Sequence, residues 1–180
     1  RSLENHPGIQ HLDLSWALSE SVIGEAAEAC GAALAKLLRR NQVLEALLLT
    51  EDHLGTEAVI QVADAVSTHR SLTRLELNYN EMKDEGAAAL AKMLRSNRKL
   101  EILCLHANCI GAIGIEALCN ALTENQSLRS IDLHHNACGD IGAPLGEALR
   151  HSRVESWDLR YMQLGLASFM AIAERLGPSV

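Results

Sequence analysis

Two short segments carry side chains that can bind a metal ion, and they do so at matching spacings. Cys104 and His106 are separated by one residue, and Asp132 and His134 repeat this arrangement. Alternate residues of a strand point to the same face, so on two neighbouring strands the four side chains would form a small square. Zinc accepts sulfur, nitrogen and oxygen ligands in tetrahedral geometry, which makes the square a hypothetical metal site.

The alternative is that these four residues are solvated polar side chains in a groove, and we favour it. None of the usual close-spaced zinc motifs is present, and a flat sheet rarely brings four ligands to one point. The sequence therefore predicts no metal and no cofactor.

The spacing of the two pairs comes from a longer repeat. The residues Leu72, Leu75, Leu77 and Asn80 follow the frame L-x-x-L-x-L-x-x-N. The regular copies of this frame are 28 residues apart and start at Leu44, Leu72, Leu100 and Leu128. Less regular copies start at Ile9 and Val154. We predict a single array over residues 1–180, with six repeats starting near residues 9, 44, 72, 100, 128 and 154.

Each repeat combines two periodicities. Leu75 and Leu77 alternate with polar residues, which predicts a short strand with one buried face. Apolar residues then follow at helical spacing, as at Ala87, Leu90 and Leu94. Strands lie about 4.8 Å apart and packed helices about 8–10 Å apart. A stack of these units must therefore bend into a horseshoe arc, an α/β solenoid with parallel strands on the concave face and helices on the convex face.

Two sets of asparagines recur with the repeat, and we interpret both as structural. The first set should turn inward and pair with backbone groups; it comprises Asn80, Asn108 and Asn136, with Asp52 in the equivalent position. The second set follows the helices and should end them in the left-handed conformation; it comprises Asn41, Asn97 and Asn125, with His69 at the fourth position.

The run from Asn108 to Gly114, Asn-Cys-Ile-Gly-Ala-Ile-Gly, together with the 28-residue unit, resembles leucine-rich repeats of the ribonuclease-inhibitor type. Ribonuclease inhibitor, the sensor arrays of NOD-like receptors, Ran GTPase-activating protein and the actin-binding domain of tropomodulin share this repeat. The resemblance implies a leucine-rich-repeat solenoid that acts as a non-catalytic protein–protein interaction module. Such a module would bind a protein partner, or another part of its own chain, through the concave face and its loop edge.

The residues available for a partner are those that the strand frame leaves outside the core. Three of the five aromatic residues of the chain, Trp16, Tyr79 and Tyr161, occupy one row where the strands leave the sheet. Exposed aromatic residues on a rigid scaffold are favoured binding anchors, and the acids among their neighbours should select a basic patch. The predicted partner-binding residues are Trp16, Glu51, Glu76, Tyr79, His106, Asp132, His134, His135, Asp158, Arg160 and Tyr161.

Two other functions remain open. One is GTPase activation of the kind that Ran GTPase-activating protein performs through loops at one edge of its arc; here that edge offers Trp16, Glu51, Tyr79 and His135. The other is an actin or cytoskeletal scaffold. Catalytic motifs such as a nucleophile elbow, H-E-x-x-H or C-x-x-C are missing, so we expect no enzymatic activity.

Composition narrows the class of partner. The net charge is −7 and the pI is near 5.6, without the basic stripe that nucleic-acid binding requires, so we expect no nucleic-acid partner. Apolar runs are too short to span a membrane. Of the five cysteines, we expect Cys109, Cys119 and Cys138 to be reduced packing residues in a cytoplasmic protein.

The two ends of the sequence depart from the frame, as terminal repeats do. Ala17 and Met162 replace the asparagine in the first and last copies. The first copy also has seven extra residues, which we place in a loop at 16–22. Residues 1–5 resemble the last turn of a helix from a preceding repeat. We therefore expect the chain to be a fragment of a longer protein.

Overall fold

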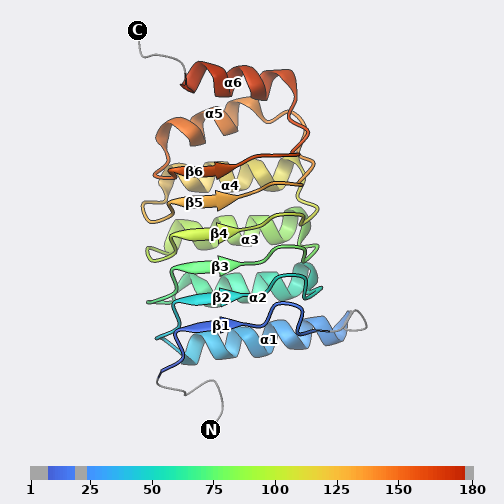
Figure 1. Ribbon diagram of the computed structural model, residues 1–180, viewed down its shortest axis with the longest axis vertical. Helices are drawn as coiled ribbons and strands as arrows, with labels where there is room; N and C mark the ends of the chain where they lie inside the picture. Colours follow the sequence, from blue (N-terminus) through green and yellow to red (C-terminus); the bar gives the residue numbers. More distant parts are fainter. Residues whose placement is uncertain (1–7, 19–23, 177–180) are drawn as a thin grey trace.

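The computed structural model describes residues 8–18 and 24–176 as six strand–helix units in chain order (Figure 1). The strands are β1 (His11–Asp13), β2 (Ala46–Leu48), β3 (Arg74–Glu76), β4 (Ile102–Cys104), β5 (Ser130–Asp132) and β6 (Ser156–Asp158). The helices are α1 (Glu25–Arg40), α2 (Gly55–Ser67), α3 (Lys83–Ser96), α4 (Ala112–Glu124), α5 (Gly142–His151) and α6 (Leu166–Leu176). This alternation confirms the predicted α/β solenoid.

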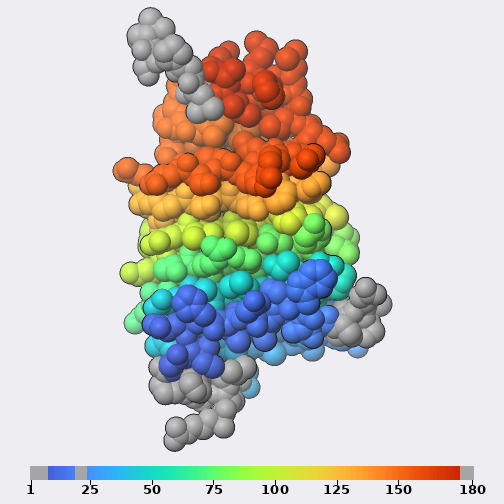
Figure 2. Space-filling view, viewed as in Figure 1, coloured from blue at the N-terminus to red at the C-terminus, as the bar shows by residue number. Residues whose placement is uncertain are grey.

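The strands form one parallel sheet in the order β1-β2-β3-β4-β5-β6. Equivalent frame positions pair across it, so that Leu75 lies opposite Leu103 and Leu103 opposite Ile131. In Figure 1, α2, α3 and α4 lie behind the sheet, whereas α5 and α6 extend beyond β6, so the row of helices is longer than the row of strands. The array therefore curves with its strands on the inside, as the two packing distances require. In the space-filling view each repeat is a band across the molecule (Figure 2).

The core consists of stacked leucines and small helix residues. Leu75 and Leu103 have no exposed surface, and alanines such as Ala58 and Ala87 allow the helices to approach closely. At the contact between α1 and α2, a Cβ on Gly31 would lie 2.5 Å from the Ala58 Cα. Only a glycine permits that approach.

The first set of asparagines is buried and bonds to backbone groups, as predicted. The Asn108 Nδ2 donates to the Leu77 carbonyl at 2.7 Å, and its Oδ1 accepts from the Asn80 N–H at 3.0 Å. Asn136 stands in the same relation to Leu105 and Asn108. These bonds connect each repeat with the one before it.

The second set does not adopt the left-handed conformation that the sequence predicted. Asn41 has φ −88° and ψ 113°, and Asn97 has φ −71° and ψ 137°. In this extended conformation the Asn97 Oδ1 accepts the N–H groups of Lys99 and Leu100 at 2.8 Å each. The Asn97 Nδ2 donates to the Val66 carbonyl of the preceding repeat. These residues therefore fix the start of the next strand rather than reverse the helix end.

His69 performs the same role with an imidazole. Its Nδ1 accepts the Leu72 N–H at 3.1 Å, and its Nε2 lies 2.7 Å from the Asn41 carbonyl oxygen. These two bonds require the neutral tautomer with the proton on Nε2. Burial lowers the pKa of His69 from its ordinary value, which is consistent with a neutral ring in the folded state.

The predictions for the chain ends could not be compared with the structure, and those for the cysteines were confirmed only in part. Residues 1–5, proposed as a helix end, and residues 19–22 of the predicted loop lie outside the described residues. Cys119 and Cys138 are buried, as expected for packing residues, but Cys109 is exposed, so the packing interpretation was wrong there. Within residues 8–18 and 24–176, the helices are too short or too polar to cross a bilayer.

Leu103→Asp should destabilise the protein by about 4 kcal/mol, because it buries an unpaired carboxylate between two layers. Chemical denaturation followed by circular dichroism measures the effect. Ile113→Asp is the control, since Ile113 is 74% exposed and lies in the first turn of α4, where an acid suits the helix dipole. Equal stability of the two variants would contradict the buried position of Leu103.

His69→Asn should make stability less dependent on pH. The folded-state pKa of His69 is lowered, so its contribution is complete above the unfolded-state pKa and is lost as pH falls below it. Asparagine supplies the same donor and acceptor without titrating, as it does in the other repeats. Unfolding free energies measured from neutral to mildly acidic pH should fall less in the variant. An unchanged slope would show that His69 does not titrate as proposed.

Asp52→Asn should stabilise the protein at neutral pH. Asp52 is 1% exposed, and its Oδ2 has no hydrogen-bond partner among the described residues. Burial raises its pKa, so the penalty of the charged form grows as pH rises through the folded-state pKa. The amide removes that charge, and a gain of about 1–3 kcal/mol is expected. The gain should disappear at acidic pH, and a gain that is independent of pH would contradict the account.

Candidate functional site

The predicted partner-binding residues lie on the concave face and on the edge where the strands end. The parallel register puts Glu76, Cys104, Asp132 and Asp158 in one row across β3 to β6. Beyond this row, the Leu105 N–H donates to the Asp132 carbonyl at 2.9 Å and the Ala107 N–H to the His134 carbonyl at 3.0 Å. The segments that follow neighbouring strands therefore stay in register after the strands end. Their side chains remain aligned as well.

The outer edge of this face is a row of residues in the left-handed conformation, which we call the rim. Its members have φ between 53° and 63° and are Trp16, Glu51, Tyr79, Ala107, His135 and Tyr161. This turn directs side chains out of the sheet; Trp16 is 68% exposed and Tyr161 70%. The row was predicted from the sequence, but its left-handed conformation was not. The absence of β-branched residues from all six positions is a signal that could have revealed it.

Five rings form a continuous series along the rim and the position just inside it, which we call the ring row. The Tyr79 ring meets the His106 ring edge-on at 4.3 Å between centroids. His106 stacks on His134 at 3.8 Å with an interplanar angle of 18°. His134 lies 5.3 Å from His135, and His135 stacks on Tyr161 at 4.5 Å. Aromatic and imidazole rings from four successive repeats thus lie next to one another on one face of the array.

Each of the predicted acids on the concave face, Glu76, Asp132 and Asp158, has a partner two residues away in its own repeat. Arg74 forms a hydrogen bond and ion pair with Glu76, and Arg160 binds both carboxylate oxygens of Asp158. The hydrogen bond from Arg160 lowers the pKa of Asp158 to about 2. The concave face therefore carries less uncompensated negative charge than its acids alone indicate.

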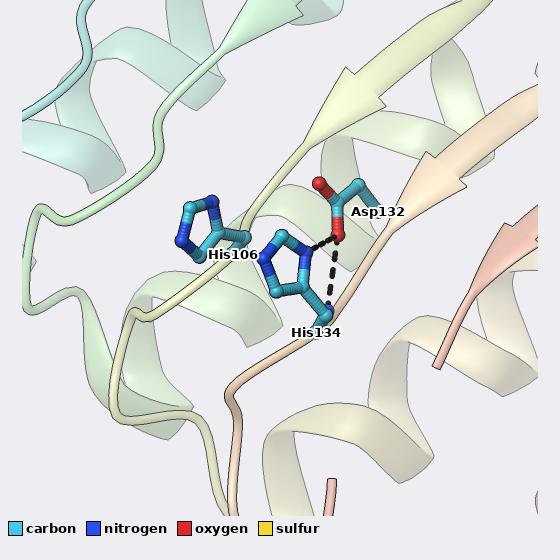
Figure 3. Close-up of side chains that lie close together, drawn as sticks. All are labelled: His106, Asp132 and His134. Atoms are coloured by element: carbon cyan, nitrogen blue, oxygen red, sulfur yellow. Dashed lines mark hydrogen bonds and ion pairs between the residues drawn. The ribbon is translucent and has the colours of Figure 1, made fainter. Parts of the chain in front are cut away.

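Asp132 pairs with a histidine instead. Its Oδ1 lies 2.5 Å from the His134 Nδ1 and accepts the His134 backbone N–H at 3.0 Å. Figure 3 shows the two residues in contact, with the His106 ring beside the His134 ring. Burial, followed by the neighbouring His134, lowers the pKa of His106.

One residue of the predicted four-ligand square does not join the others. Donor atoms of His106, Asp132 and His134 all lie within 4.8 Å of one another, whereas Cys104 is not part of this group. Cys104 is the last residue of β4, and burial raises the pKa of its thiol to about 11. The square is therefore reduced to three residues.

A hollow of about 540 Å³ opens beside the ring row. Tyr79 and His135 stand on either side of it, and Ala107 lies between them in the rim. The hollow exists because alanine is the one small residue among the six rim positions. Exposed Cys109 also lines it. The hollow was not predicted from the sequence, although a small rim residue between two rim residues with rings could have indicated it.

The comparisons with known proteins agree with the repeat fold. A sequence model described as "Leucine Rich repeat" matches residues 68–91 and 96–119. These two segments are leucine-rich repeats, and the other strand–helix units repeat the same architecture. The six strand–helix units and their helical convex side agree with the ribonuclease-inhibitor type.

Among solved structures, the array is similar to leiomodin-1 actin-binding site 2, with a TM-score of 0.69 and 18% sequence identity. The similarity covers 80% of this chain and 86% of that one, and at this identity it shows a shared fold. No curated protein sequence matches the array significantly.

A leucine-rich-repeat array is a scaffold for protein interaction. The sheet and the buried asparagines Asn80, Asn108 and Asn136 fix the backbone beneath the ring row. The side chains of the ring row are not needed for the core. Such a surface can present aromatic groups without ordering a loop, which lowers the entropic cost of binding.

Proposed function

We propose that this array binds a protein partner through its concave face and ring row. The observation that carries the proposal is the ring series from Tyr79 to Tyr161, which crosses four repeats on one face of the array. Aromatic side chains are enriched among the residues that dominate binding energy. No packing role accounts for Tyr161, which is 70% exposed.

The hollow beside Ala107 supports the same proposal. Tyr79 and His135 bound a space large enough for a side chain of the partner, and anchors set in such pockets commonly carry much of the affinity. The partner is expected to present an apolar or cationic side chain there, because the π faces of aromatic rings attract both.

Charge should contribute less than the acidic composition suggests. Glu76 and Asp158 are already paired with Arg74 and Arg160, so a basic partner gains little from them directly. We expect the acids to steer the encounter of the two proteins rather than to set the affinity.

Actin is the first partner to test. Leiomodin-1 shares the fold, and its matched region is an actin-binding site. At 18% identity this similarity supplies a candidate for the test and carries no further argument. GTPase activation is less favoured, because the rim of this array carries no lysine or arginine.

Tyr79→Ala and Tyr161→Ala should each weaken partner binding by about 1–3 kcal/mol, mainly through faster dissociation. Actin co-sedimentation gives the first measurement, and affinity capture from cell lysate with each variant extends it to other proteins. Biosensor kinetics on the captured partner then separate association from dissociation.

Lys92→Glu is the control, since Lys92 is exposed on α3 of the convex side. If the Lys92→Glu variant lost the partner and both tyrosine variants retained it, the binding surface would lie on the helices. That result would contradict the proposal.

A further inference from the structure

We propose that His106, Asp132 and His134 form a binding site for a zinc-like transition-metal ion, with one coordination position open to the concave groove. The three residues come from two neighbouring repeats, and all are half-buried. Their donor atoms already lie within 4.8 Å of one another (Figure 3).

The distances are close to those that a metal needs. Zinc–ligand bonds of about 2.0–2.1 Å in tetrahedral geometry place neighbouring donor atoms roughly 3.3 Å apart. The Asp132 Oδ1 and His134 Nδ1 are 2.5 Å apart across a hydrogen bond, so a metal must displace the shared proton and this pair must open. The stacked rings of His106 and His134 must turn so that one nitrogen of each points at the ion. The proposal assigns these changes to rotation of the side chains.

The backbone beneath the site is held firmly. The N–H groups of Leu105 and Ala107 donate to the carbonyls of Asp132 and His134, at 2.9 and 3.0 Å. The His106 N–H donates to the Asn78 side chain at 3.0 Å. Ligands on a fixed backbone lose little entropy when a metal binds, which favours affinity.

The chemistry of the three side chains selects the ion. Two imidazoles and one carboxylate suit zinc, copper, nickel and ferrous iron. Calcium and magnesium need more oxygen donors than this site offers. Three protein ligands leave the fourth tetrahedral position to water or to a donor from another molecule.

The neighbouring acid and thiol do not complete the ligand set. Asp158 Oδ2 lies 3.7 Å from the His134 Nδ1, but Arg160 binds both of its oxygens. Cys104 lies outside the group of donor atoms. The proposal therefore predicts different effects for Asp132 and Asp158, although these residues occupy equivalent positions in adjacent strands.

Isothermal titration of the full chain with zinc chloride tests the site. The wild-type protein should bind one zinc ion per chain through this cluster. His106→Gln, His134→Gln and Asp132→Asn should each weaken that binding at least tenfold, because each removes a direct ligand, and even the loss of a group hydrogen-bonded to a ligand costs about 10–100-fold. The matched variants Asp158→Asn, His135→Gln and Cys104→Ser should stay within about twofold of wild type. Circular dichroism checks that every variant is folded.

Cobalt substitution supplies a second readout. Two nitrogens and one oxygen should give weak visible bands, without the intense near-ultraviolet absorption of a cobalt thiolate. Wild-type protein that binds zinc no more tightly than the His106→Gln/His134→Gln double variant would overturn the proposal. So would strong thiolate absorption that Cys104→Ser removes, or equal losses from Asp132→Asn and Asp158→Asn. The test needs no protein partner, so its failure would leave the proposed function untouched.

Discussion

The array depends on the hydrogen bonds that connect backbone groups at the point where each strand leaves the sheet. A chain that turns there exposes N–H and C=O groups inside a dry core, and such groups must find partners. Asn80, Asn108 and Asn136 supply them, each with an amide that reaches the carbonyl of the preceding repeat. A carboxylate cannot donate, which is why Asp52 at the first of these positions keeps an oxygen without a partner among the described residues.

The surface proposed for binding follows from this constraint. Each of these buried asparagines comes directly after a rim residue. The hydrogen bonds that hold the asparagine in place therefore also hold the backbone of the left-handed residue before it. Because the same turn recurs in every repeat, the rim side chains align one strand spacing apart, and rings at neighbouring positions come into contact. The regularity that stabilises the core thus produces an ordered aromatic surface on the opposite side of the same backbone.

Much of this arrangement could be predicted from the sequence, since the leucine frame fixes both the periodicity and the buried face. The strand positions, the helices and the inward asparagines all followed from it. The conformation of Asn97 did not, because the chemistry of asparagine suits a left-handed turn and a side-chain cap equally well. The exposure of Cys109 was missed because its neighbours in the frame are buried, whereas its own left-handed backbone turns it outward.

Contacts between side chains were harder to predict than positions. The frame placed Glu76 and Asp158 on the concave face, but their pairing with Arg74 and Arg160 depends on rotamers. Likewise, the spacing brought Cys104 and His106 to the same face, although only His106 approaches Asp132 and His134. Register predicts which residues are neighbours, and the flexible ends of side chains decide which of them interact.

Hydroxyl-radical footprinting of the array with and without its bound partner tests the central claim most directly. Tyr79 and Tyr161 on the rim are 43% and 70% exposed, and Phe169 and Met170 on α6 are 69% and 54% exposed. All four side chains react readily with the radical, so each experiment contains its own reference. We expect the partner to protect Tyr79 and Tyr161 and to leave Phe169 and Met170 unchanged. Protection of Phe169 and Met170, with the two tyrosines as reactive as in the free protein, would contradict the account.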